Sequence, residues 1–126
     1  MKYVLFQIKT DNSISVIENG ESADLELSRL RELVGGHIDI VTPSALRDID
    51  PFAVMVIDDE WKMKYKEHNS LATVLYGNPF DFVVGDVVIG TRFNVDPFAV
   101  PDVYAIDQVR SERIKREIEL IKDWCI

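Results

Sequence analysis

Cysteine is nearly absent from the chain. Cys125 is the single cysteine among 126 residues, so no disulfide can form within the protein. Small secreted domains often depend on several disulfides for stability, whereas a reducing compartment keeps thiols free. We therefore expect the protein to be cytoplasmic.

Residues suited to covalent or metal chemistry are also scarce. The only histidines are His37 and His68, and no Gly-x-Ser-x-Gly motif is present. This leaves no nucleophile–base set and no Cys/His metal cluster. We predict no catalytic residue, no metal site and no cofactor. A pair of carboxylates that converge in the fold would still permit acid–base work, so a minor hydrolase stays open.

Long hydrophobic runs are missing. No segment approaches the roughly 18 apolar residues that a membrane-spanning helix needs, so we expect no membrane partner. The apolar segment at 3–8 is too short and too interrupted for a signal peptide, and it alternates in the manner of a strand.

Basic residues are outnumbered, 14 against 22 acidic ones, which gives a net charge of −8. Residues 106–126 contain five acids and five bases, so the whole excess belongs to residues 1–105. Phosphate backbones repel such a surface, and we expect no direct binding of nucleic acid. A basic protein surface, including one that normally holds nucleic acid, would be attracted to it.

What the sequence does contain is the pattern of one α+β domain spanning residues 1–126. Hydrophobic residues make up 47% of the chain, enough for a core. Strand-like segments occur at 3–8, 14–17, 37–41, 53–57, 61–66 and 86–90. We predict a mixed, mostly antiparallel sheet of about five or six strands, with two short helices and a longer C-terminal helix.

Capping residues and apolar spacing mark these helices. The first is predicted from about Ala23 to Val34, with Ser22 or Asp24 as its cap and a glycine stop at Gly35. Asn69 should cap a short helix that Gly77 closes. The amphipathic pattern of 102–126 predicts the long helix. The polar segment 44–52 is predicted to be a loop.

One lysine stripe opposes the acidic charge. Lys62, Lys64 and Lys66 alternate with apolar residues, so on a strand they would line one face, close to Asn69 and the helix that it caps. Ammonium groups beside a helix N-terminus suit an anionic, nucleotide-like ligand. The alternative is a solvated strand face that prevents pairing with other chains.

Two further features are candidates for contact with a partner. The acidic turn Asp58, Asp59 and Glu60 suits a basic surface, and Phe98 lies in an apolar, proline-containing loop. The alternative for residues 58–60 is an ordinary polar turn, and the alternative for the loop with Phe98 is that it covers the sheet. The apolar face of the C-terminal helix either docks on the core or pairs with a second copy, so a homo-oligomer stays open.

The motifs of residues 1–93 resemble those of a widespread family of small proteins in bacteria, phages and conjugative elements, a domain of unknown function. The shared motifs are a helix ending in Val-Gly-Gly, an Asp-Glu turn before a lysine-bearing strand, an Asn that opens a short Ala-containing helix, and a Gly-Asp strand. In this chain they are Val34, Gly35, Gly36; Asp58, Asp59, Lys62, Lys64; Asn69, Ala72, Thr73, Leu75, Tyr76, Gly77; and Gly85, Asp86, Val87, Val88, Gly90.

The chain departs from the family pattern in two places. Trp61 stands where the family usually has Gly, and the C-terminal helix has no evident counterpart. The resemblance implies a fold and a mobile-element setting, with the cytoplasm of a bacterial host as the location. It transfers no catalytic residue.

Together these observations favour a small acidic accessory protein of a phage or mobile element. Its expected partner is a host protein, for which a defence component is one candidate. The alternatives are sequestration of a small anionic ligand by Lys62, Lys64, Lys66 and Asn69, and a minor hydrolase.

Overall fold

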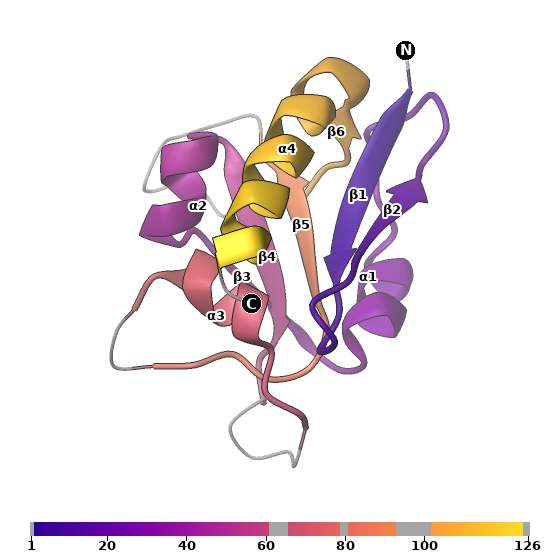
Figure 1. The fold of residues 1–126 in the computed structure, drawn as a ribbon. Coiled ribbons are helices and arrows are strands. Elements are labelled where there is room, and N and C mark those ends of the chain that lie inside the picture. The colour runs from indigo at the N-terminus through magenta and orange to yellow at the C-terminus, as the bar shows by residue number, and fades with distance from the viewer. Residues whose placement is uncertain (1, 61–65, 79–80, 93–101, 125–126) are drawn as a thin grey trace.

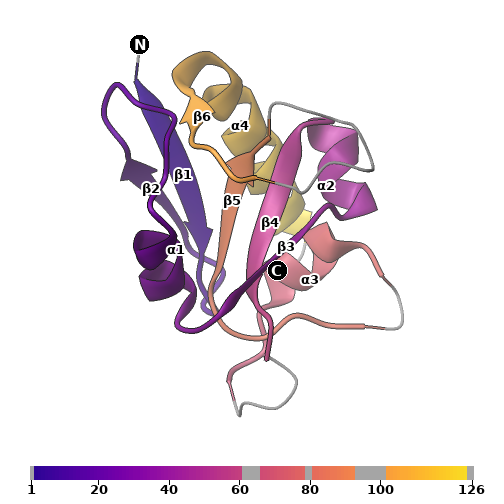
Figure 2. The same cartoon turned by 180° about the vertical axis from the view of Figure 1, so that it is seen from behind.

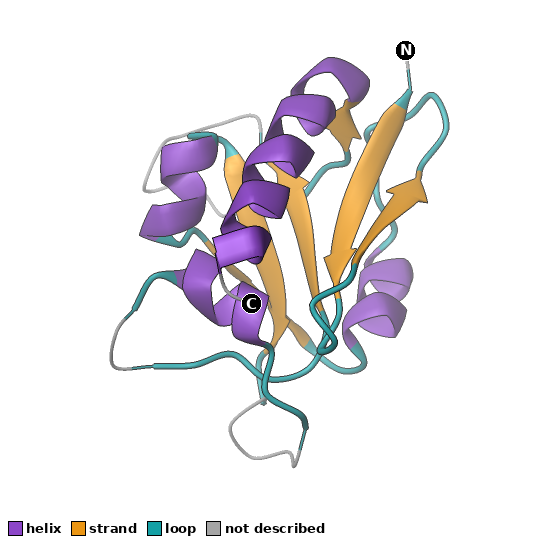
Figure 3. Ribbon diagram, viewed as in Figure 1, coloured by secondary structure: helices purple, strands orange, loops and turns teal. Residues whose placement is uncertain are grey.

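A computed structural model describes residues 2–60, 66–78, 81–92 and 102–124. These residues form six strands and four helices (Figure 1 and Figure 3). In chain order they are β1 (Tyr3–Ile8), β2 (Ile14–Glu18), α1 (Leu27–Val34), β3 (Ile38–Val41), α2 (Ser44–Ile49), β4 (Ala53–Asp58), α3 (Ser70–Tyr76), β5 (Val87–Thr91), β6 (Ile106–Asp107) and α4 (Gln108–Trp124).

The strands form one open sheet in the order β2-β1-β5-β4-β3, and each pairing is antiparallel. β1 and β5 lie centrally although about 80 residues separate them in the chain, with Phe6 opposite Ile89. β6 pairs with the first residues of β1. Each residue of β4 and of β5 is buried. This matches the nearly unbroken apolar runs that predict central strands.

The helices cover the two faces of the sheet unequally. α2, α3 and α4 lie on one face, and α1 lies on the other (Figure 1 and Figure 2). Because side chains alternate along a strand, Phe6 and Met55 pack beneath α2–α4, whereas Leu5 and Val56 pack beneath α1. The sheet is therefore the middle of three layers, with a hydrophobic cluster on each side.

Gly90 allows a branch in the sheet. β5 pairs with β1 up to Ile89, and beyond that point Thr91 bridges Tyr104 while Ile106 pairs with Val4. Beyond Ile89, β5 no longer pairs with β1, and the segment leading into β6 takes its position beside β1. A Cβ on Gly90 would lie 2.7 Å from Val103 Cγ1 and 2.9 Å from the Tyr104 carbonyl oxygen.

We expect Gly90→Ala to lower the free energy of unfolding by about 2 kcal/mol, because the methyl group overpacks the crossing of two backbones. Gly20→Ala is the comparison. It adds a methyl in open space at a left-handed φ of 68°, where strain alone costs about 1 kcal/mol. Urea denaturation of both variants measures the difference. Equal losses would show that the crossing segment yields to the methyl group.

The α+β class, a mostly antiparallel sheet of about six strands and the long C-terminal helix are confirmed. β6 was not predicted, because residues 106–107 were assigned to the C-terminal helix. The helix caps at Asn69, Gly35 and Gly77 are also confirmed: the Asn69 side chain accepts a hydrogen bond from the Ala72 N–H, and both glycines are left-handed. No parallel pair occurs among the described strands, so the sheet is antiparallel rather than mixed. The predicted lysine-bearing strand falls on 61–65, outside the described residues.

Three predictions about helices were wrong: one helix was missed and two were given the wrong start. Residues 44–49 form α2 instead of a loop, because Leu46 alone anchors a short helix whose other side chains are polar or partly exposed. α1 begins at Leu27, not Ala23, since the Ala23 carbonyl accepts the Ala105 N–H and the Asp24 carbonyl accepts the Asn19 side chain. α4 begins at Gln108 because residues 104–107 pair with the sheet.

Within the described part of the chain, no helix is both long and apolar enough to cross a membrane.

Candidate functional site

Lys66 and Asp58 form an ion pair beside the end of α1. The two side chains come from the segment before α3 and from the last residue of β4, and Lys66 Nζ lies 2.8 Å from Asp58 Oδ2. The same ammonium group donates to the carbonyl oxygens of Val34 at 3.2 Å and Gly35 at 3.5 Å. A positive charge is favourable at this helix end, where carbonyl groups lack intrahelical donors.

Two glycines make room for the Lys66 side chain. A Cβ on Gly85 would lie 2.8 Å from Lys66 Cδ, and one on Gly35 would lie 3.4 Å from its Nζ. Both glycines also have positive φ, 75° and 87°. The Val-Gly-Gly and Gly-Asp motifs therefore meet around one lysine.

Asn69 performs a second internal task close by. It is fully buried, and its amide nitrogen donates to the carbonyl oxygens of Ile8 and Gly85 at 3.0 and 2.9 Å. Its Oδ1 accepts from the Ala72 N–H at 3.0 Å. The Asn69 side chain thus joins the end of β1 and the start of α3 to the segment before β5.

These contacts correct part of the predicted sites. Lys66 and Asn69 direct their polar atoms to protein partners, so they do not present the free groups that an anionic ligand requires. Asp58 is 2% exposed and cannot contact a partner's surface. Asp59 and Glu60 are exposed and stay predictions. Lys62, Lys64 and Phe98 lie outside the described residues, so the lysine stripe is not seen as a unit.

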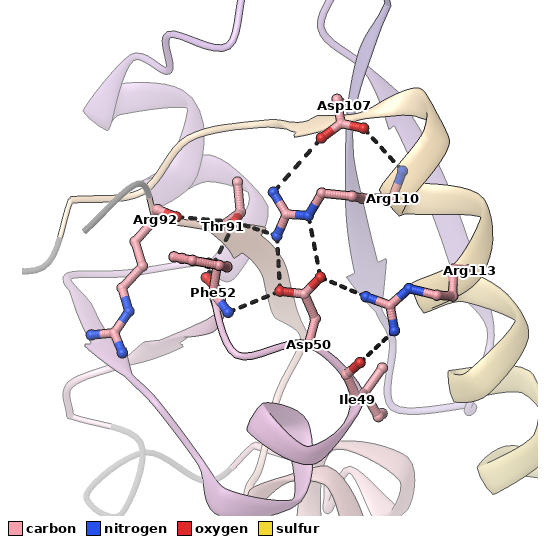
Figure 4. A network of polar contacts seen from close by, with 8 residues as sticks. All are labelled: Ile49, Asp50, Phe52, Thr91, Arg92, Asp107, Arg110 and Arg113. Atoms are coloured by element: carbon pink, nitrogen blue, oxygen red, sulfur yellow. Dashed lines mark hydrogen bonds and ion pairs between the residues drawn. The ribbon is translucent and has the colours of Figure 1, made fainter. Parts of the chain in front are cut away.

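Among the described residues, an extensive polar cluster surrounds Asp50, which sequence reasoning missed (Figure 4). Asp50 ends α2 and is 2% exposed. Arg110 binds it with two atoms, Nη2 at 2.9 Å from Oδ1 and Nε at 3.2 Å from Oδ2. Arg113 Nη2 lies 2.8 Å from Oδ2, and the Phe52 N–H donates to Oδ1 at 2.8 Å.

Further contacts hold both arginines in place. Arg113 Nη1 donates to the Ile49 carbonyl at 2.6 Å. Arg110 Nη2 donates to the Thr91 hydroxyl at 2.9 Å, and the guanidinium group lies over the Phe52 ring. The backbone N–H of Arg110 donates to Asp107 Oδ1 at 2.9 Å. The cluster therefore fastens the start of α4 to the end of α2 and the end of β5.

Asp50 is ionised in this setting. Burial alone would raise the pKa of its carboxyl group, but the hydrogen bonds from Arg110 and from the Phe52 N–H, with the charges of both arginines, outweigh burial and lower the pKa below its ordinary 3.8. Four N–H groups already occupy the two carboxylate oxygens. The arrangement is suited to holding elements together rather than to acid–base chemistry.

Among the described residues, two grooves are considered as places for a ligand or partner. The first, here called the acid-rimmed groove, lies on the α1 face and has a volume of about 440 Å³. Its lining combines apolar side chains with two carboxylates and contains no basic residue: Asp24, Leu25, Leu27, Leu30, Ile38, Ile40, Asp102, Val103 and Tyr104. Leu27 is 49% exposed there.

The second groove runs between α4 and the β1–β2 hairpin and measures about 310 Å³. Its lining carries both charge signs, with Lys2 and Lys115 opposed by Glu18 and Glu112. An apolar floor is provided by Phe6 and Val16. With charges balanced in this way, the groove selects no class of charged partner.

The described residues contain no group of three or more His, Cys, Asp or Glu side chains placed to hold a metal ion. Comparison of the chain with protein-family models, curated proteins and solved structures gives no match.

Proposed function

We propose that this protein works by binding a basic protein surface, and that the acid-rimmed groove is the contact. The observation that carries the proposal is the groove's lining, in which Asp24 and Asp102 border the exposed Leu27 and half-buried apolar side chains, with no base among them. A partner that inserts apolar side chains flanked by Lys or Arg complements both features.

Two properties of the molecule support this assignment. The net charge of −8 accelerates the encounter with a basic partner and repels nucleic acid. Ile38 and Ile40 of the groove belong to β3, an edge strand whose outer side pairs with no described strand. Since no described strand pairs with that edge, an extended segment of the partner would add to the sheet there.

The resemblance to proteins of phages and conjugative elements favours a host protein as the partner. A defence component that uses a basic surface to hold nucleic acid fits this chemistry. The acidic groove would then occupy a surface that otherwise contacts phosphate.

Capture of host proteins tests the proposal with matched variants. The wild-type protein, Asp24→Lys/Asp102→Lys and the control Asp48→Lys/Glu67→Lys are immobilised and exposed to host lysate at low and high salt. Both variants change the net charge equally, and the control acids are exposed and do not line the groove. We expect a basic protein retained at low salt by the wild type and the control, with about tenfold weaker retention by the groove variant.

Retention of nothing at either salt concentration would refute the proposal of a protein partner. Equal retention by all three proteins would move the contact away from the groove. A third double variant, Asp59→Lys/Glu60→Lys, then decides whether the acidic turn is the contact instead.

A further inference from the structure

The backbone of β3 directs the polar groups of two residues towards the open edge of the sheet. The Asp59 N–H donates to the His37 carbonyl at 2.9 Å, and these two residues continue the β3–β4 register by one pair. In an antiparallel ladder, such hydrogen-bonded pairs alternate with pairs whose backbone groups point away from each other. Ile38 and Ile40 therefore turn their N–H and C=O groups outwards, where no described strand pairs with them.

The side chains of β3 differ between the two faces of the sheet. Ile38 and Ile40 line the acid-rimmed groove and pack against the hydrophobic cluster beneath α1. Asp39 lies between them and points to the opposite face, where it is exposed and forms no ion pair with a described residue. The three residues thus offer backbone hydrogen bonds at the edge, an apolar surface on one face and a single negative charge on the other.

A second copy of the chain is a poor occupant of this edge. In a two-fold, antiparallel arrangement, both copies use all their outward groups only when Ile38 of one copy lies opposite Ile40 of the other. That register places Asp39 opposite Asp39 of the second copy, and like charges in this position are destabilising. A basic side chain in the same position forms a favourable cross-strand pair instead. The charge of Asp39 therefore disfavours self-pairing and selects a basic strand.

We propose that β3 receives an extended segment of the basic partner, which adds a strand with the pattern apolar–basic–apolar; this assignment rests on the function proposed for the groove. The basic residue lies opposite Asp39, and its two apolar neighbours lie next to Ile38 and Ile40, on the side of the groove. Because the pattern reads the same in both directions, it holds for a parallel or an antiparallel added strand. Asp24 and Asp102 then favour further basic residues beyond the apolar pair.

Amide hydrogen exchange measured by NMR tests the edge in two steps. In the free protein, the amides of Ile38 and Ile40 should exchange fast, whereas those of Asp39 and Val41, which donate to β4, should be protected. The peptide Lys-Ser-Val-Lys-Val-Ser-Lys at about 1 mM should then slow exchange at Ile38 and Ile40 about threefold, the factor 1 + [L]/Kd for a Kd of about 0.5 mM. The same peptide with its Val-Lys-Val residues N-methylated cannot pair and should have no effect.

Charge reversal tests the pairing of Asp39 with the basic residue. Because Asp39 is exposed, Asp39→Lys leaves the fold intact. This variant should bind the lysine peptide about fivefold more weakly than the wild type does, and it should prefer a peptide with Glu in the central position. Glu117→Lys changes an exposed acid on α4 and alters the net charge equally. It should keep the wild-type preference for the lysine peptide.

Several results of these titrations would overturn the proposal. One is slow exchange of Ile38 and Ile40 in the free protein, which would show that the edge is already covered. Another is a lysine peptide that leaves both amides unprotected, or that binds Asp39→Lys as tightly as the wild type. Protection that appears without peptide and only at high protein concentration would assign the edge to a second copy.

Capture from host lysate separates this inference from the function proposed for the groove. A host protein that the wild type and Asp39→Lys retain equally, but that Asp24→Lys/Asp102→Lys does not, would leave the groove as the contact and remove β3 from it. Retention of no host protein refutes the function proposed for the groove, and the peptide titration then decides separately whether β3 takes up a basic strand.

Discussion

Asp50→Asn is expected to lower the free energy of unfolding by about 3 kcal/mol. Removal of one partner from a buried ion pair costs roughly 3–5 kcal/mol, because it leaves the other charge unpaired. The lower end applies because the side chains of Arg110 and Arg113 are 29% and 48% exposed, so water compensates part of the loss. The amide also cannot accept all four N–H groups that the carboxylate holds.

The effect should depend on pH with a definite sign. The pKa of Asp50 is lower in the folded protein than its ordinary 3.8, so its contribution is fully present above that value and is lost as the pH falls through the folded pKa. The asparagine variant has no such titration. The difference between the two proteins should therefore be largest at neutral pH and should shrink in acid.

Urea denaturation at pH 7 and at about pH 3 measures the loss of unfolding free energy and its dependence on pH. Asp48→Asn provides the control, since Asp48 is an exposed acid on the same short helix. A loss that stays constant between the two pH values would show that Asp50 contributes through hydrogen-bond geometry rather than through its charge.

Asn69→Ala is expected to cost about 3 kcal/mol or slightly more. The carbonyl oxygens of Ile8 and Gly85 would lose their donor at a buried site, at roughly 1–3 kcal/mol each, and α3 would lose a cap worth about 1 kcal/mol. Replacement of the buried amide by a methyl group also leaves a cavity. Ser70→Ala, at the next position, changes only an exposed contact to His68 and should cost little.

Thermal unfolding gives the size of the loss, and hydrogen exchange locates it. The amide of Ala72 should exchange faster in Asn69→Ala, because its acceptor has been removed. Asn69→Asp keeps the cap but removes both donors. If Asn69→Asp were as stable as the wild type, the two carbonyl contacts would contribute nothing.

The sheet was predictable because local sequence patterns reveal its central strands. The run at 53–57 and the alternation at 3–8 each reveal a strand without knowledge of the neighbours. The Asn69 cap was predictable for the same reason, since a cap acts within three residues. The order of the strands was not, because nothing local indicates that β1 pairs with β5.

The Asp50 cluster was invisible for a related reason. Asp50, Thr91 and Arg110 come from three distant parts of the chain, and none belongs to a motif. A weak signal did exist at residue 50, since an acid three residues before a buried strand requires a partner when it is itself buried. Only the path of β6, which delivers the start of α4 to that corner, identifies the partner as arginine.

The lysine stripe shows how a local pattern can leave the role of a side chain undetermined. The alternation of Lys62, Lys64 and Lys66 indicates a strand, and a strand places the three groups together. Lys66 lies beyond any described strand, and its ammonium group is occupied by Asp58 and by the end of α1. In the sequence, this contact of Lys66 is indicated by Gly35 and Gly85. A side chain that passes between two backbones requires positions without Cβ.

The pairing of β1 has a consequence for synthesis. The first strand to leave the ribosome finds β2 at once, but its other edge is completed by β5 and β6, whose residues are made about 80 and 100 positions later. Pairings this distant in the chain slow folding and leave an apolar hairpin exposed in the meantime. We therefore expect the nascent chain to need protection by a chaperone until residue 107 has emerged, and a chain truncated before β6 to aggregate rather than to fold.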